Sequence, residues 1–300
     1  MTQATPNPMR GIFWMFMTGL SFVAVTALVK SMGPRIPPAE AAFLRYLLGL
    51  VFLLPMIHDL REAHLTPRQW RLFTLRGLCH AVGVILWFYA MTRIPIAEVT
   101  AMNYLAPVYV SVGAALFLGE RLAARRIAAV IVALIGAAII LRPGFREVSQ
   151  GHIAMVFAAI VFAGSYLTTK VLSGEVKPTV VVAMLSIFVT IALAPFALAD
   201  WVAPNLDELA ILFGVAVFAT AGHYTMTLAF AAAPVTVTQP VTFLQLVWAV
   251  LLGVFMFGEP IDVWVLLGGF VILASVTFIT WREAVLRRQP ITPPSPATKL

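Results

Sequence analysis

The stretch Phe117–Arg126, FLGERLAARR, returns 139 residues later as Met256–Val265, MFGEPIDVWV. Each copy follows a long apolar run, contains Gly-Glu and leads into another apolar run. The first copy carries Arg121, Arg125 and Arg126, whereas the second contains no Lys or Arg. A repeated corner with unequal charge predicts an internal repeat whose two copies face different surroundings.

Composition decides what those surroundings are. The chain has 300 residues, of which 61% are hydrophobic and 11% charged, and its mean hydropathy is +0.95. A soluble domain has about 25% charged residues, so this chain has too little polar surface to cover a globule in water. The sequence therefore predicts an integral membrane protein in a lipid bilayer. The basic residues behind the net charge of +7 lie mostly in short loops between the apolar runs. This placement indicates the orientation of the spans in the membrane and not a nucleic-acid partner.

Apolar runs long enough to cross a bilayer occur ten times. A hydrocarbon core about 30 Å thick needs about 20 residues of helix. The sequence therefore predicts an all-α integral membrane protein with ten transmembrane helices. We place them near residues 11–29, 39–57, 70–91, 95–118, 124–141, 153–172, 179–199, 209–230, 235–257 and 262–281.

The distribution of basic residues predicts the orientation. If both termini are cytoplasmic, thirteen of the 20 Lys and Arg residues lie on the inner side and five on the outer side. Arg45 and Arg76 complete the set and lie within spans. Cytoplasmic loops are enriched in Lys and Arg, so we expect a multi-pass protein of the bacterial inner membrane with both termini inside. The basic Gly-Glu corner then lies inside and its uncharged copy outside.

The repeat extends over both halves, at a shift of 140 residues in the earlier part and of 139 residues, without a gap, from Gly83 to Glu120. We infer two homologous halves of five helices each, residues 1–145 and 146–285, followed by a Pro-rich tail, 286–300, that we expect to be disordered. Because five is odd, the second half is inverted in the membrane, as in many secondary transporters. Matched pairs include Gly83 with Gly222, Pro95 with Pro234, Glu120 with Glu259, Lys30 with Lys170, and Pro38 with Pro178.

This arrangement, with Gly-Glu closing the fourth and ninth spans, resembles the drug/metabolite transporter superfamily and its EamA-type families. Other matching points are Lys30, Arg45, the stretch RIPIAEVTAMNYLAP that opens the fourth span, and LRPG at Leu141–Gly144. The resemblance implies a central cavity lined by helices 1, 3, 4, 6, 8 and 9, with helices 5 and 10 behind. It also implies transport of amino acids, including aromatic ones, or of metabolites such as S-adenosylmethionine or riboflavin. Leu185 matches Arg45 in the second half, so any role of that arginine is asymmetric.

The third span carries ionisable and aromatic residues on one face. Arg76, His80 and Trp87 are spaced at helical intervals, and His80 lies about 15 Å from the span's cytoplasmic start. Polar groups inside a bilayer face the bundle interior or a water-filled cavity. His80 can bind a carboxylate or relay a proton; the alternative is a histidine hydrogen-bonded to a neighbouring helix.

The fourth and ninth spans carry matched polar stripes. Thr100 and Asn103 match Gln239 and Thr242 in the repeat. Two such helices meeting at a shared site would bind substrate; the alternative is interhelical hydrogen bonding. The remaining candidate substrate ligands are aromatic or polar residues on the fourth, sixth, eighth and ninth spans: Tyr104, Tyr166, His223 and Gln245.

Carboxylates near span ends have a local explanation. Glu120 and Glu259 precede the fifth and tenth helices, and Glu98 lies in the first turn of the fourth, where a carboxylate is stabilised by the helix dipole and free N–H groups. Proton coupling is the alternative for the first two. We expect Glu40 and Arg45 to shape the outer mouth.

The leading hypothesis is a secondary carrier that works by alternating access and exports an aromatic or other neutral amino acid. The chain contains no GxxxxGK[ST] phosphate loop. Its single cysteine, Cys79, and the absence of metal-ligand spacing predict no cofactor and no metal. We expect a monomer acting on a small-molecule substrate. The alternatives are a carrier of S-adenosylmethionine or riboflavin, a membrane-embedded enzyme, and a channel or scaffold.

Overall fold

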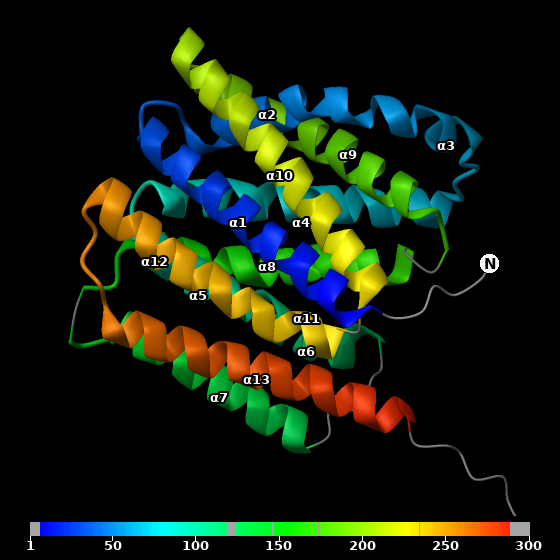
Figure 1. Cartoon of the computed structure of the whole chain (residues 1–300). Coiled ribbons are helices and arrows are strands. Elements are labelled where there is room, and N and C mark those ends of the chain that lie inside the picture. Colours follow the sequence, from blue (N-terminus) through cyan, green and yellow to red (C-terminus); the bar gives the residue numbers. More distant parts are fainter. Residues whose placement is uncertain (1–6, 119–123, 146, 173–174, 234, 289–300) are drawn as a thin grey trace, which may run out of the picture.

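The computed structural model describes residues 7–118, 124–145, 147–172, 175–233 and 235–288, whose regular structure is helical (Figure 1). Within those ranges, nine helical stretches are long and apolar enough to cross a membrane, and α12 (Phe243–Phe257) is a shorter apolar helix. Together they account for the ten predicted spans. The predicted all-α membrane fold is confirmed.

The spans of the first half are formed by α1 (Pro8–Met32), α2 (Pro38–Gly49), η1 (Leu50–Met56), α3 (Ile57–Glu62), α4 (Pro67–Met91), α5 (Ile96–Asn103), α6 (Leu105–Leu118) and α7 (Ala124–Leu141). Those of the second half are formed by α8 (Gln150–Leu172), α9 (Pro178–Ala199), α10 (Leu206–Ala232), α11 (Val235–Thr238), η2 (Gln239–Thr242), α12 and α13 (Val263–Arg288). Local signals explain several starts. Thr66 and Asn205 form capping boxes at α4 and α10, and Pro38 and Pro178 occupy first helical positions.

The fourth and ninth spans are each broken at matched positions. Pro107 has no N–H to offer the carbonyl of Asn103, and α5 gives way to α6 at Tyr104. In the ninth span, η2 contains Pro240 and ends at Thr242. The hydroxyl of Tyr104 donates a hydrogen bond to the carbonyl of Thr242 at 2.7 Å. The two breaks are therefore joined to each other, in the kind of discontinuous helix that transporters use at their substrate sites.

Helix packing follows the sequence repeat. Helix α1 packs mainly against α10, and α4 packs against α8. Exchanging the two halves converts the first of these pairs into the second. The same exchange maps the pairs α2–α9 and α7–α13 onto themselves and converts α6–α8 into α1–α12. The packing thus has an approximate twofold relation between the halves, and α7 and α13 lie together at one edge (Figure 1).

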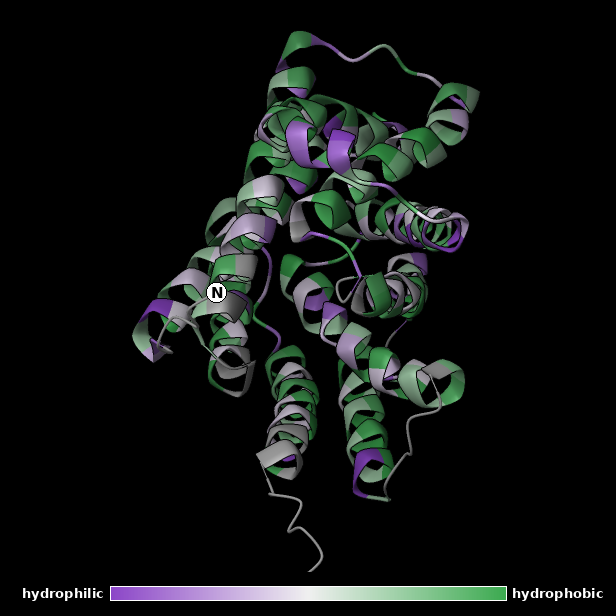
Figure 2. Cartoon of the chain, turned by 90° about the vertical axis from the view of Figure 1, so that its right-hand side faces the viewer, coloured by the Kyte–Doolittle hydropathy of each residue, from purple (hydrophilic) through white to green (hydrophobic). Residues whose placement is uncertain are grey.

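The exterior suits lipid. Ile131 on α7 is 52% exposed and Phe255 on α12 is 81% exposed, and hydrophobic residues colour most of each helix (Figure 2). Helix α1 begins and α13 ends on the same side of the molecule, as an even number of spans requires (Figure 1).

The predicted tail begins too early. Helix α13 continues to Arg288, whereas residues 286–300 were expected to be disordered. The first proline after Ile261 in this stretch is Pro290, so the sequence has no helix breaker before that point. Residues 289–300 lie outside the described residues, as does the first Gly-Glu corner with Glu120. The limits of the two halves, 1–145 and 146–285, stay a prediction.

Candidate functional site

His80 lies at the centre of the bundle. It is the fourteenth of the 25 residues of α4, and its side chain is buried. Its Nδ1 lies 3.3 Å from the hydroxyl oxygen of Ser165 on α8. The interhelical hydrogen bond that was the alternative reading of His80 is therefore present, and it joins helices from the two halves.

Two guanidinium groups lie near His80. Arg76, one turn earlier on α4, donates a hydrogen bond to the carbonyl of Val181 at 2.7 Å. Arg45 on α2 stacks on the ring of Tyr46, with its central carbon 3.9 Å from the ring centroid. Both arginines act electrostatically on His80.

Glu40, on the same helix as Arg45, is hydrogen-bonded to a backbone group of another segment. The carboxylate of Glu40 accepts a hydrogen bond from the N–H of Val202 at 2.8 Å. Arg45 lies seven residues into α2, about 10 Å from its start, and acts electrostatically on His80. The role of Glu40 and Arg45 in shaping the outer mouth stays a prediction.

Aromatic rings surround this group. The ring of Phe162 lies 5.1 Å from His80, and Tyr46 meets His80 at right angles at 6.2 Å. Tyr166 stacks on Phe162 at 6.2 Å, and Trp87 meets the edge of Phe162 at 6.4 Å. We call the following set the histidine cluster: Arg45, Tyr46, Arg76, His80, Trp87, Phe162, Ser165, Tyr166 and His223.

His223 on α10 completes the histidine cluster from the second half. It acts electrostatically on His80, and Arg45 and Arg76 act on it in turn. Its ring lies 5.2 Å from Phe22 on α1. Five predicted site residues therefore come together from α4, α8 and α10: Arg76, His80, Trp87, Tyr166 and His223.

The polar stripe of the fourth and ninth spans lies elsewhere, at the contact of α5 with α12. Thr100 donates its hydrogen bond to the carbonyl of Ile96 in its own helix at 2.9 Å. Tyr104 bridges to the carbonyl of Thr242, as described above.

The other members of the stripe show no direct link to His80. Gln245 packs against Gly19, where an added Cβ would lie 3.4 Å from the Cβ of Gln245. Asn103 is half-buried, and the side chain of Gln239 lies outside the described residues. The stripe as a substrate site stays a prediction.

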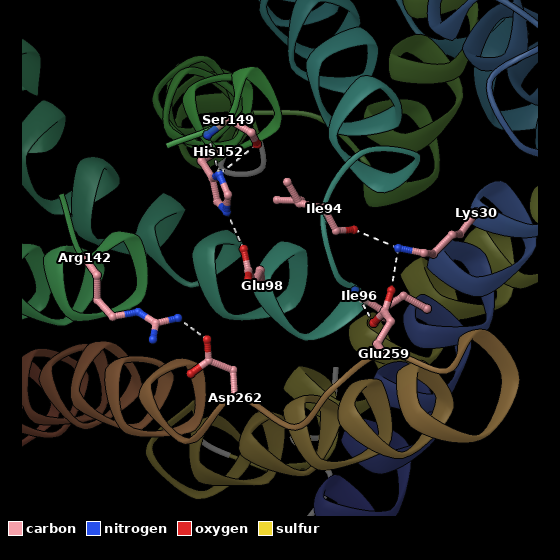
Figure 3. A network of polar contacts seen from close by, with 9 residues as sticks. All are labelled: Lys30, Ile94, Ile96, Glu98, Arg142, Ser149, His152, Glu259 and Asp262. Carbon is pink, nitrogen blue, oxygen red and sulfur yellow. Dashed lines mark hydrogen bonds and ion pairs between the residues drawn. The ribbon is translucent and has the colours of Figure 1, made fainter. Parts of the chain in front are cut away.

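A partly buried ion pair, which the sequence analysis did not predict, ties one end of the bundle (Figure 3). Lys30 on α1 pairs with Glu259 and donates to the carbonyl of Ile94 at 2.9 Å. Glu259 also accepts the N–H of Ile96, the first residue of α5, at 2.9 Å. Glu259 therefore caps the fourth span, and the prediction that it caps the tenth is wrong. Asp262 takes that role, because it accepts the N–H of Trp264 at 2.9 Å.

A second buried pair lies beside the first. Glu98 on α5 contacts Nε2 of His152 on α8, and the hydroxyl of Ser149 lies 2.8 Å from the Nδ1 of His152 (Figure 3). Arg142 pairs with Asp262 nearby. A cavity of about 310 Å³ is lined by residues of both pairs. Glu98 was identified from its place in the first turn, but nothing local to it indicated a partner 54 residues away.

Two ion pairs at opposite ends of the bundle, Lys30–Glu259 and Arg68–Glu175, differ in how deeply they are buried. We call the end with Lys30 and Glu259 the Glu259 end; those side chains are 18% and 11% exposed. At the opposite end, Arg68 pairs with Glu175, and Arg68 is 63% exposed. The Arg68 guanidinium holds the pKa of the Glu175 carboxyl below its usual value. Breaking a buried pair costs more than breaking an exposed one, so we expect Lys30–Glu259 to hold its end more firmly than Arg68–Glu175 holds the other.

Comparison with known proteins gives a consistent result. The sequence matches the family described as "EamA-like transporter family" twice, over residues 9–142 and 149–281. A riboflavin transporter of Rhizobium johnstonii is 31% identical over 284 residues, which cover 93% of this chain and 94% of that protein. An S-adenosylmethionine uptake transporter of Rickettsia conorii is 27% identical, covering 94% and 96%. A crystal structure with 17% identity superposes with a TM-score of 0.62 over 92% of this chain and 98% of the other, which shows a shared fold.

Proposed function

The chain belongs to the EamA-like transporter family, and from that premise we propose that it carries a small metabolite with a planar ring across the bacterial inner membrane by alternating access. It is a multi-pass membrane protein, and its relatives are named as small-molecule transporters. The observation that carries the proposal is the histidine cluster, which lies midway along α4 and draws on both halves.

The arrangement of the halves supports a carrier over a pore or an enzyme. Helices α4 and α8, which supply most of the cluster, are exchanged with α1 and α10 by the twofold relation of the packing. Ion pairs between the halves tie both ends, through Lys30–Glu259 and through Arg68–Glu175. Opening one tie at a time would expose a central site to one side at a time. By the excess of Arg and Lys at the opposite end, we place the Glu259 end outward and both termini in the cytoplasm.

The relatives shift the preferred substrate. The sequence favoured export of an aromatic or neutral amino acid, whereas the named relatives carry riboflavin and S-adenosylmethionine. Both of these compounds contain a flat heterocyclic ring, which Tyr46, Phe162 and Tyr166 can contact face or edge. We therefore favour a heterocyclic metabolite and keep aromatic amino acids in the test.

Counterflow in proteoliposomes tests this proposal. Vesicles loaded with unlabelled riboflavin, S-adenosylmethionine or tryptophan should transiently accumulate the matching labelled compound for the true substrate class. His80→Gln should reduce the initial rate at least tenfold, because it removes the imidazole at the centre of the cluster. His58→Gln is the matched control, since His58 is 83% exposed, and it should keep the wild-type rate. Counterflow for none of the compounds, or a normal rate in His80→Gln, would contradict the proposal.

A further inference from the structure

Two arginines of the histidine cluster are buried without a carboxylate partner. Arg45 is 9% exposed and Arg76 6% exposed. Arg76 donates one hydrogen bond to the carbonyl of Val181, and its Nε is buried without a hydrogen-bond partner. Arg45 contacts the ring of Tyr46, and neither arginine forms an ion pair within the described part of the chain.

Among the described residues, the groups that act on Arg76 and His80 bring no formal negative charge. Arg76 lies in the field of the phenols of Tyr46 and Tyr166, and His80 lies in the field of His223, Arg76 and Arg45. No carboxylate is among these groups in the described residues. The acidic residue of α2, Glu40, is hydrogen-bonded to Val202 and lies in the field of Arg35 and Glu208. The cluster therefore carries two positive charges that the protein itself does not balance.

Two buried positive charges destabilise the protein unless a negative charge balances them. An ionised side chain inside a bilayer pairs with an opposite charge or lines a path for one. A buried charge without a partner is among the more destabilising features a protein can contain. Guanidinium groups present paired N–H donors that match carboxylate and phosphate oxygens. The missing partner is accordingly an anion that is absent from the chain.

We propose that the transported solute is an anion, a planar ring compound whose carboxylate or phosphate binds between Arg45 and Arg76 while its ring lies against Tyr46, Phe162 and Tyr166. This rests on the proposed transport function and narrows it from ring-bearing metabolites in general to negatively charged ones. Arg45 matches Leu185 in the repeat, so the anion site is a feature of one half only.

Matched probes that differ only in charge test the proposal. We would titrate the purified full-length protein with 10-carboxymethylflavin and its carboxamide, and with indole-3-acetate and indole-3-acetamide. The carboxylate of at least one pair should bind at least tenfold more tightly than its amide. Equal binding of acid and amide, or binding of amides only, would overturn the proposal. So would failure of all four probes in a protein that shows riboflavin counterflow, and in that case the transport function would stand.

Substitutions of the two arginines test whether they cause the preference for the carboxylate. Arg45→Gln and Arg76→Gln should each reduce the preference for the carboxylate to less than threefold, while Arg45→Lys should retain part of it. Arg71→Gln is the matched control, because Arg71 lies on the same helix as Arg76 but is exposed at its end. A preference that survives in both cluster variants would refute the assignment.

A measurement without any probe guards against misfolded variants. If Arg45 is an unbalanced charge in the empty protein, Arg45→Gln should raise the melting temperature by about 2–4 °C or more. A lower melting temperature would mean that Arg45 has a structural partner, against the proposal. Because a lipid headgroup offers the same phosphate chemistry, binding is compared in phosphatidylcholine nanodiscs with and without phosphatidylglycerol. Binding of phosphatidylglycerol without any soluble anion would also refute a transported anion.

Discussion

Replacing Glu259 with Gln should loosen the Glu259 end without unfolding the protein. Glu259 pairs with Lys30 and caps α5 through the N–H of Ile96. The substitution removes the charge but leaves an amide oxygen that can still accept that N–H. It also leaves Lys30 with its bond to the carbonyl of Ile94 and with no carboxylate.

The magnitude follows from burial. Removing one partner of a fully buried pair costs about 3–5 kcal/mol, and removing one from an exposed pair costs about 0–1 kcal/mol. Lys30 and Glu259 are 18% and 11% exposed, and the cap is retained, so we take about 2 kcal/mol between those limits. At about 1.4 kcal/mol per factor of ten, this shifts the balance between closed and open ends by roughly 30-fold.

Cysteine labelling measures this shift. Val254 lines the cavity beside Glu259, so Val254→Cys in a Cys79→Ser background reports opening of that end. A membrane-impermeant maleimide should react about tenfold or more faster in the Glu259→Gln variant. The exposed Glu147→Gln is the matched control and should not change the rate. The double variant with Lys30→Gln should be no faster than the more reactive single variant. A rate within threefold of wild type would refute the closing role of the pair.

Three further predictions follow from the fold. Tyr104→Phe removes the hydrogen bond that joins the two broken spans, so the melting temperature should fall by about 2–4 °C in thermal unfolding. Gly268→Ala places a Cβ 2.5 Å from a carbonyl oxygen of α7, so detergent-purified protein should lose stability while the substrate preference in counterflow is retained. Single cysteines at Asp207 and Arg125 in a cysteine-free background should label from opposite sides of the membrane, and labelling from one side would contradict the inversion.

The spans could be predicted because lipid imposes their length and composition, and each predicted run corresponds to a helical stretch. The breaks were harder to predict. Pro107 marks a weak point in its span, but the end of α5 at Tyr104 depends on the contact of that residue with Thr242, 138 positions away. Helix propensity contains no information about such a contact.

The candidate site, like the fold, could be predicted from the sequence only where it depends on local spacing. The i, i+4 spacing that put Arg76 and His80 on one face is a local property and could be read from the sequence. The approach of Arg45 to His80 depends on how α2 crosses α4. The sequence shows only how far Arg45 lies along its own span. Glu259 was misassigned for a related reason. Gly258 adopts a left-handed conformation, φ +63°, that turns the next residue away from α13 and toward the start of α5.

An inverted repeat makes the inward-open and outward-open backbones nearly equivalent, so differences between the halves decide which state is favoured. Lys30 and Glu259 tie the Glu259 end, and their matches in the repeat, Lys170 and Glu120, have side chains outside the described residues. Among the described pairs at the other end, Arg68–Glu175 is exposed, and water and salt weaken it. The empty carrier should therefore rest with the Glu259 end closed. The unbalanced charges of Arg45 and Arg76 add a second asymmetry. Any solute that neutralises them changes the free energy of exposing the histidine cluster to one side of the membrane or the other. Symmetry in the fold thus supplies the two states, and these few unsymmetric side chains determine how a bound solute shifts the balance between them.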